Sequence, residues 1–265
     1  MILGFSHVTI GTSDLMLGVN HLARMGYRPN FIETGVPNSK EKAPLLRQYN
    51  PTHDIAFLIG DGVPSVELIN HYGDIFHKNE NIWLVCRNAE PLESWSEVEQ
   101  RHHIPSQKYS STVQRIYGQK VETFFDHVLG ANIFWLQSNP LESPGIISVA
   151  VLINNSVDIE KWLSNERFFE HTQEDMWKLQ NPSQTLSIDI IFLRSSDETV
   201  NCSNFLDGAG CSCLAFHGRY TDPIPNDEEI YYTTTPKFRL FVNKEWLKIQ
   251  FLKIPNFPLI EVIEK

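Results

Sequence analysis

A recurring order of one strand, one helix and three further strands constrains the fold of this chain more than any other feature. In residues 5–12 apolar and polar side chains alternate as in a half-buried strand, with Val8 and His7 on opposite faces. An amphipathic helix is predicted over residues 14–25, because Ser13 or Asp14 can cap it and Gly26 can end it. Its apolar stripe consists of Leu15, Val19, Leu22 and Ala23. Three strand-like segments follow, and the last is "SVELIN" at residues 65–70.

This order recurs along the chain, although the repeats share little sequence identity and the last one lacks an obvious helix. The sequence therefore predicts four βαβββ modules, at residues 1–73, 80–140, 145–197 and 208–265. Aligning their first strands places His7, Asn81, Ser148 and Cys213 at one position. Aligning their last strands places Glu67, Phe134, Asp189 and Glu261 at another. These two aligned positions supply the candidate site residues.

Composition excludes several classes of partner. The 265 residues carry a formal net charge of −10, and clustered cations are absent, so a nucleic-acid partner is not expected. No apolar run reaches the roughly eighteen residues that span a bilayer. The first residues, "MILGFSHVTIG", lack the features of a secretory signal, and four cysteines are too few for a disulfide framework. We therefore expect a cytoplasmic protein with no membrane partner and a small-molecule ligand.

Two segments of the first module resemble the vicinal oxygen chelate superfamily, the group of glyoxalase I, methylmalonyl-CoA epimerase, extradiol dioxygenases and bleomycin-resistance proteins. They are "FSHVTIGTSDLMLGVNHLARMGYRP" and "HDIAFLIGDGVPSVELIN". The resemblance implies an α+β fold in which paired modules curl into half-open barrels around a site. Four modules would form two half-barrel domains, and the turn-rich segment "NPLESPG" places their boundary between 1–142 and 143–265.

The resemblance also implies a site for a divalent metal. His7 and Glu67 match the metal-binding histidine and glutamate of the superfamily, and Glu67 is the candidate catalytic residue. Strand alternation should turn both side chains into a concave face while Val8 and Val66 point to a helix layer. A metal with open positions can be chelated by adjacent substrate oxygens and act as a Lewis acid.

Consecutive modules usually pack together, so pairing of module one with module two is the simpler expectation. The aligned residues of module two are then Asn81, which is a weak ligand, and Phe134, which cannot ligate. With Trp83, these residues would line an aromatic pocket beside an incomplete metal site.

Pairing of module one with module four is the alternative. It would add Glu261 and Cys213 to His7 and Glu67, which gives a set of nitrogen, sulfur and carboxylate ligands. On this reading His7, Glu67 and Glu261 are the candidate metal ligands.

Three functions remain open from the sequence. The first is a metal-dependent isomerase, lyase or dioxygenase that acts on a small oxygenated substrate. The alternative is a metal-free protein of the resistance type, which sequesters a small molecule in a degenerate site. A third class, an interaction domain with an inert cavity, would expose a large apolar surface.

Overall fold

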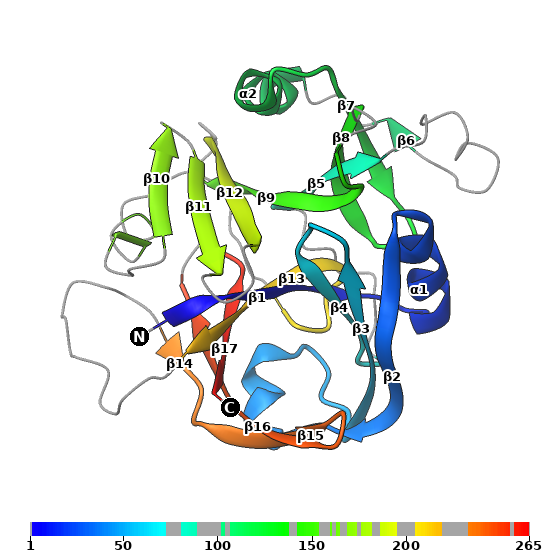
Figure 1. Cartoon of the computed structure of the whole chain (residues 1–265). Helices are drawn as coiled ribbons and strands as arrows, with labels where there is room; N and C mark the ends of the chain where they lie inside the picture. The colour runs from blue at the N-terminus through cyan, green and yellow to red at the C-terminus, as the bar shows by residue number, and fades with distance from the viewer. Residues whose placement is uncertain are drawn as a thin grey trace.

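The first predicted module is present in the structure, a computed structural model of the chain (Figure 1). It consists of β1 (Ile2–Gly11), α1 (Leu15–Arg24), β2 (Tyr27–Pro37), β3 (Thr52–Gly60) and β4 (Ser65–Asn70). A short 3-10 helix, η1 (Lys40–Leu45), lies between β2 and β3. The structure describes residues 2–72, 81–88, 102–103, 107–137, 142–153, 160, 163–164, 169–173, 176–181, 186–194, 205–218, 233–254 and 257–264.

The other modules supply the remaining elements. The second contains β5 (Ile82–Asn88), β6 (His102–His103), α2 (Gln107–Tyr117), β7 (Val121–Asp126) and β8 (Ala131–Gln137). The third contains β9 (Gly145–Ile153), β10 (Phe169–Gln173), β11 (Met176–Asn181) and β12 (Leu186–Arg194). The fourth contains β13 (Gly210–Gly218), β14 (Thr233–Thr234), β15 (Phe238–Val242), β16 (Glu245–Lys253) and β17 (Leu259–Glu264).

The modules pair in a nested order, one with four and two with three. One sheet has nine strands in the order β14-β16-β17-β13-β1-β4-β3-β2, with β15 beside β16. The other has eight strands in the order β10-β11-β12-β9-β5-β8-β7-β6. In each sheet the first strands of two modules pair antiparallel at the centre, β1 with β13 and β5 with β9.

The expected sequential pairing is therefore wrong, and a boundary near residue 142 does not separate the two sheets. Residues 2–70 and 210–264 share one sheet, whereas residues 82–194 form the other. Consecutive modules usually pack together. Here the modules pair through hydrogen bonds between their first strands, β1 with β13 and β5 with β9, and these ladders join modules one and four and modules two and three. The fold class itself is confirmed: βαβββ modules pair into two half-barrels, each built on one sheet.

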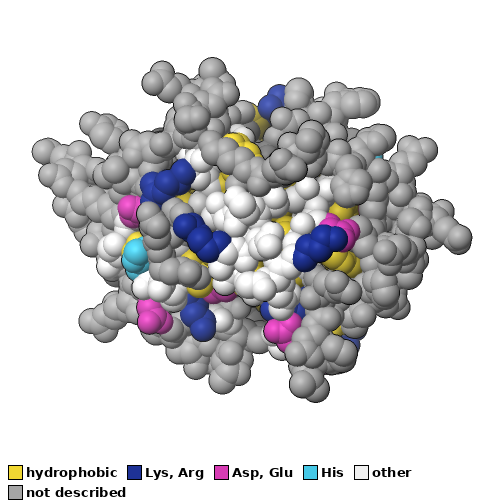
Figure 2. Space-filling view, turned by 90° about the horizontal axis from the view of Figure 1, so that it is seen from above, with side chains coloured by type: hydrophobic (Ala, Val, Ile, Leu, Met, Phe, Trp, Pro, Cys, Tyr) yellow, Lys and Arg dark blue, Asp and Glu magenta, His cyan; other side chains and the backbone are white. Residues whose placement is uncertain are grey.

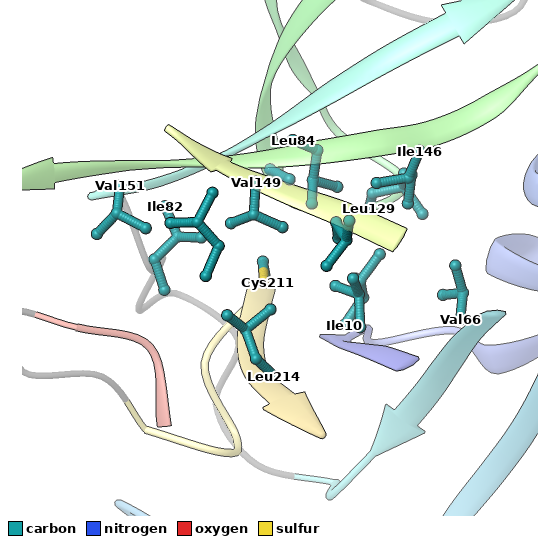
Figure 3. Close-up of a cluster of buried hydrophobic side chains, with 14 of the residues drawn as sticks. Ile10, Val66, Ile82, Leu84, Leu129, Ile146, Val149, Val151, Cys211 and Leu214 are labelled. Carbon is teal, nitrogen blue, oxygen red and sulfur yellow. The ribbon is translucent and has the colours of Figure 1, made fainter. Parts of the chain in front are cut away.

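The two sheets pack face to face through one apolar core (Figure 3). Ile10 and Val66 from the nine-stranded sheet meet side chains such as Leu84 and Val149 from the eight-stranded sheet. All four are fully buried. The predicted strand alternation is confirmed, because Val66 points away from the cavity. The sequence predicted that a helix layer covers this face, but the second sheet covers it together with α1. Neither half-barrel could bury this face alone.

Helix α1 follows the predicted pattern. The Asp14 side chain caps it by accepting a hydrogen bond of 2.9 Å from the Leu17 backbone N–H. Gly26 follows the helix with a φ of +88°, a left-handed conformation that favours glycine. Ala23, which the predicted apolar stripe included, is exposed. The buried side consists of Leu15, Gly18, Val19, His21 and Leu22.

Helix α2 covers the concave face of the eight-stranded sheet (Figure 1). Val113 of α2 is fully buried against a cluster that includes Val85 and Ile191. Seen from the α2 side, Lys and Arg side chains are spread over the described surface with acidic side chains among them, and hydrophobic atoms show only in small areas (Figure 2). The apolar cluster under α2 is therefore covered. Within the described residues, no helix is long and apolar enough to cross a membrane.

A buried ion pair joins the two halves. His21 on α1 lies 2.8 Å, Nε2 to Oδ2, from Asp126 at the end of β7, and both side chains are buried. Oδ1 of Asp126 accepts hydrogen bonds of 2.9 Å from the backbone N–H groups of Val128 and Leu129. Burial raises the pKa of Asp126, but the hydrogen bond and charge of His21 outweigh it, so the pKa lies below its ordinary value.

This ion pair predicts acid sensitivity. Because the folded pKa of Asp126 is depressed, its contribution is present above its unfolded pKa of 3.8 and is lost as the pH falls below it. Asp126→Asn keeps the turn acceptor but removes the charge, and we expect it to lower the free energy of unfolding at pH 7 by about 1–3 kcal/mol. Urea titrations at pH 3, 4, 5 and 7 measure this. An equal loss for wild type and variant between pH 5 and pH 3 would contradict the prediction.

Candidate functional site

The hollow of the nine-stranded sheet holds a cavity of about 350 Å³. Strands β1, β3 and β4 form one wall, β15, β16 and β17 form the facing wall, and η1 adds part of the lining (Figure 1). The two sides of the half-barrel approach each other where the Asn243 backbone N–H donates a hydrogen bond of 3.1 Å to Oε1 of Glu33 on β2. The curl of this sheet therefore creates a concave site lined by side chains of modules one and four.

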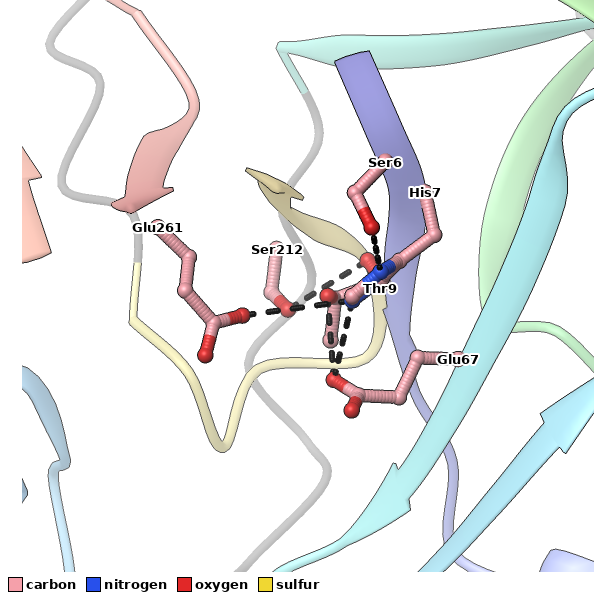
Figure 4. Close-up of polar contacts among 6 residues, drawn as sticks. All are labelled: Ser6, His7, Thr9, Glu67, Ser212 and Glu261. Atoms are coloured by element: carbon pink, nitrogen blue, oxygen red, sulfur yellow. Dashed lines mark hydrogen bonds and ion pairs between the residues drawn. The ribbon is translucent and has the colours of Figure 1, made fainter. Parts of the chain in front are cut away.

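His7, Glu67 and Glu261 meet in this cavity (Figure 4). Nε2 of His7 lies 3.6 Å from Oε2 of Glu67 and 3.9 Å from Oε2 of Glu261. One ligand atom from each residue lies within 4.8 Å of the others, and the side chains are 4%, 12% and 8% exposed respectively. The structure thus brings together the three residues predicted as metal ligands, through the pairing that the sequence did not favour.

A strand irregularity and two hydroxyl groups orient the donors. The β1–β13 register shifts between Phe5 and His7, a bulge that lets Ser6 and His7 both line the cavity. Ser6 Oγ lies 3.0 Å from Nδ1 of His7, so the opposite ring nitrogen faces the carboxylates. Thr9 Oγ1 donates a hydrogen bond of 3.2 Å to Oε2 of Glu67. Such supporting hydrogen bonds hold metal ligands in a fixed orientation.

Charged neighbours separate the pKa values of the two buried carboxyl groups. Burial and the nearby charge of Glu67 raise the pKa of Glu261 to about 7. Burial also acts against ionisation of Glu67, but the charge of His7, whose Nε2 lies 3.6 Å from Oε2 of Glu67, outweighs it, and the pKa of Glu67 is lowered. Burial opposes protonation of His7, yet the two carboxylates raise its pKa above the ordinary value.

The three donors fit a divalent cation. Two buried carboxylates beside each other repel, and a cation between them removes that repulsion. The buried Nε2 of His7 has no hydrogen-bond partner of its own, as expected for an atom that ligates a metal. One imidazole and two carboxylates suit the harder divalent ions, such as Mn²⁺, as well as Zn²⁺.

Cys213 occupies the position of module four that corresponds to His7 of module one. It pairs with Leu259 across the parallel β13–β17 ladder, as His7 pairs with Ser65 across β1–β4. The thiol is fully buried, and its pKa is raised well above the ordinary value by burial and by Glu261 and Glu67. It does not join the three converging donor atoms and packs instead in an apolar cluster.

The predicted pocket residues of module two lie outside this cavity. Trp83 and Phe134 stack at 4.5 Å between ring centroids in the apolar cluster beneath α2, and Tyr109 of α2 contacts Trp83. Asn81 precedes β5, and its backbone carbonyl accepts a hydrogen bond of 2.8 Å from the Leu152 N–H. These residues pack the second half-barrel because α2 occupies its concave face.

Sequence reasoning missed two polar residues of the cavity. Lys42 lies on η1 and His53 on β3, and both are buried. Lys42 follows no strand or helix periodicity, because it lies in an irregular connection. His53 lies two residues before Ile55 on β3, and both are buried. This two-residue spacing could have placed the two side chains on one face of the strand.

Comparisons with known proteins bear on the fold. No protein-family model and no curated protein matches the sequence. Glyoxalase I from Zea mays has a TM-score of 0.63 at 11% identity, covering 98% of this chain and 92% of that chain. The chain has the fold of the vicinal oxygen chelate superfamily. A Bacillus subtilis protein described as a candidate dioxygenase gives a TM-score of 0.55 at 12% identity, covering 99% and 85% respectively. At these identities the likeness is one of fold.

Proposed function

We propose that this protein is a metal-dependent enzyme, an isomerase, lyase or dioxygenase that acts on a small substrate with adjacent oxygen atoms. The observation that carries the proposal is the convergence of His7, Glu67 and Glu261 in one cavity. These residues would hold a divalent cation. When bound, the cation would supply Lewis acidity toward the substrate oxygens.

The residues of the chain would divide the remaining work. Glu67, oriented by Thr9 and with a lowered pKa, would stay ionised and hold the cation. Glu261, whose pKa of about 7 reflects burial and repulsion from Glu67 in the metal-free protein, would lose its proton as the cation binds and would become the second carboxylate ligand. The catalytic role predicted for Glu67 alone thus becomes, in our proposal, a role shared by the carboxylate pair. Phe31 and Phe57, which stack at 5.8 Å, line the cavity and would exclude water from the substrate.

Metal titration of the wild-type protein tests this proposal. Protein freed of metal with EDTA should bind one equivalent of Mn²⁺ or Zn²⁺ by calorimetry. At a free metal concentration 100 times the Kd, the free energy of unfolding should rise by about 2.7 kcal/mol. Loaded protein should then turn over members of a panel of catechols, 2-hydroxy ketones and 2-oxo acids, and His7→Ala should lower metal content and turnover together.

A failure of metal binding would leave the metal-free binding protein as the second candidate. Its supporting observation is that, within the described part of the chain, three donors converge while Cys213 packs in an apolar cluster. In that case the same panel should stabilise the protein in the presence of EDTA. Absence of metal binding at millimolar Mn²⁺ and Zn²⁺ overturns the proposed enzyme function.

A further inference from the structure

A buried lysine in the cavity wall acts on the charges of Glu67 and Glu261 but forms no close ion pair with either of them. Lys42 is 3% exposed and lines the cavity. Its Nζ lies 5.9 Å from the ring centroid of Phe238 and 5.8 Å from that of Phe251. No ion pair of Lys42 within 4.0 Å occurs in the described part of the chain. Aromatic rings alone compensate a buried ammonium group only in part.

The position of Lys42 is built into the fold. The segment that follows η1 is held by Asp207, whose carboxylate accepts hydrogen bonds of 2.9–3.0 Å from the backbone N–H groups of Arg47 and Gln48. The Leu206 N–H donates a further bond of 2.9 Å to the Leu45 carbonyl. Lys42 therefore projects from an anchored segment, and its ammonium group is held in the cavity wall before any ligand arrives.

A buried histidine pair lies near the same wall. His53 lines the cavity, and its ring centroid lies 5.2 Å from that of His71 behind it. None of the four ring nitrogens has a hydrogen-bond partner, although both residues are buried. Burial and the charge of Lys42 lower the pKa of His53 to about 3, so its ring is neutral and presents one N–H donor. Unpartnered donors in a cavity wall are suited to a ligand that brings acceptor atoms.

Charge balance indicates the sign of that ligand. A divalent cation would offset the two carboxylates Glu67 and Glu261, and His7 as a ligand would be neutral. The ammonium of Lys42 then leaves one positive charge in a buried cavity, which a monoanion would neutralise.

We propose that Lys42 and His53 form an anion-binding subsite that receives a carboxylate group of the substrate. This inference rests on the proposed function for the location of the reaction and names the substrate class as small organic acids. The apolar part of the acid would contact aliphatic and aromatic side chains of the cavity, such as Ile55, Leu240 and Ile249. The ammonium of Lys42 and the N–H of His53 would bind the carboxylate oxygens.

Two probes of nearly equal shape test the subsite. Phenylglyoxylate carries a carboxylate beside a ketone, and 1-phenylpropane-1,2-dione replaces one carboxylate oxygen by a methyl group. Calorimetry measures the Kd of each probe for wild type, Lys42→Met and the control Lys40→Met, which changes an exposed lysine on the same 3-10 helix. Each protein is measured with Mn²⁺ and after EDTA treatment, and circular dichroism confirms its fold.

We expect wild type and Lys40→Met to bind phenylglyoxylate at least about ten-fold more tightly than the dione. Lys42→Met should lose that preference through weaker binding of the acid alone. His53→Leu, which removes the N–H donor, should reduce the preference through weaker binding of the acid alone, whereas His53→Gln, which retains a donor, should keep most of it. This pair of variants tests the subsite even where Lys42→Met fails to fold, and an unchanged preference in folded His53→Leu would exclude His53 from it.

Three results would overturn the inference: no binding of phenylglyoxylate by wild type, equal affinity for the two probes, or an unchanged preference in folded Lys42→Met. A gain of Mn²⁺ affinity in Lys42→Met without a change in preference assigns Lys42 to compensation of the two carboxylates only and also overturns it. If wild type binds no metal yet prefers the acid after EDTA treatment, the proposed enzyme function fails while the subsite holds.

Discussion

Replacing Glu261 by glutamine is expected to weaken Mn²⁺ binding by at least about 100-fold, because loss of the partners that merely support a metal ligand already costs 10–100-fold. The substitution keeps the size of the side chain and removes only its charge. Oε2 of Glu261 lies 3.9 Å from Nε2 of His7, and the substitution leaves Glu67 as the one ionised carboxylate of the three donors. Calorimetric titration of EDTA-treated protein measures the change.

In metal-free protein the same substitution should reduce the loss of stability that occurs as the pH rises. The folded pKa of Glu261 is about 7, above its ordinary 4.5, so its contribution to stability is lost as the pH rises from about 4.5 to about 7. The raised pKa of His7 acts in the same direction, because stability from its protonated form is lost as the pH rises through that pKa. Metal-free Glu261→Gln should therefore show a smaller fall in unfolding free energy between pH 5 and pH 8 than wild type.

Glu264→Gln is the matched control. Glu264 lies on the same strand, and its side chain is 25% exposed beside Lys248 at 3.5 Å. This variant should retain wild-type Mn²⁺ affinity and the wild-type pH dependence. Equal metal affinity for wild type and Glu261→Gln would exclude Glu261 from the metal site. A steeper decline with pH in metal-free Glu261→Gln would show that the carboxylate pair is not under mutual repulsion.

Leu22→Asp is expected to lower the free energy of unfolding by more than about 3 kcal/mol. Leu22 is fully buried on the inner side of α1, and aspartate there removes apolar contacts and buries an unpaired carboxylate. Because the face-to-face core joins both sheets, the loss should appear as one transition that involves the whole molecule. Denaturant titrations followed by far-UV circular dichroism and tryptophan fluorescence measure it.

Asn20→Asp is the control for charge on the same helix. Asn20 is exposed on the outer side of α1, and an aspartate there lies one helical turn before Arg24. We expect a change within about 0.5 kcal/mol. Equal destabilisation by the two substitutions would contradict the assigned buried side of α1.

Local sequence signals predicted the elements of the first module well. The two-residue period placed His7 and Glu67 on the cavity side, and Asp14 and Gly26 marked the ends of α1. These features depend on neighbours within a few residues, so a single sequence suffices to find them. The second module was harder, because its sequence gave no indication that α2 would be inserted before β7 and fill the concave face. Trp83 and Phe134 were therefore expected in a pocket and instead lie in a core.

The sequence by itself determined which side chains face inward, and it supplied His7, Glu67 and Glu261 as potential ligands. Only the tertiary structure decided that they meet, because β1 pairs with β13 and thereby brings the first and last modules into one sheet. That choice depends on hydrogen bonds and apolar contacts between segments about 200 residues apart, which no local period encodes. The same long-range packing places Lys42 in the cavity wall, since Asp207 anchors its segment from a distant part of the chain.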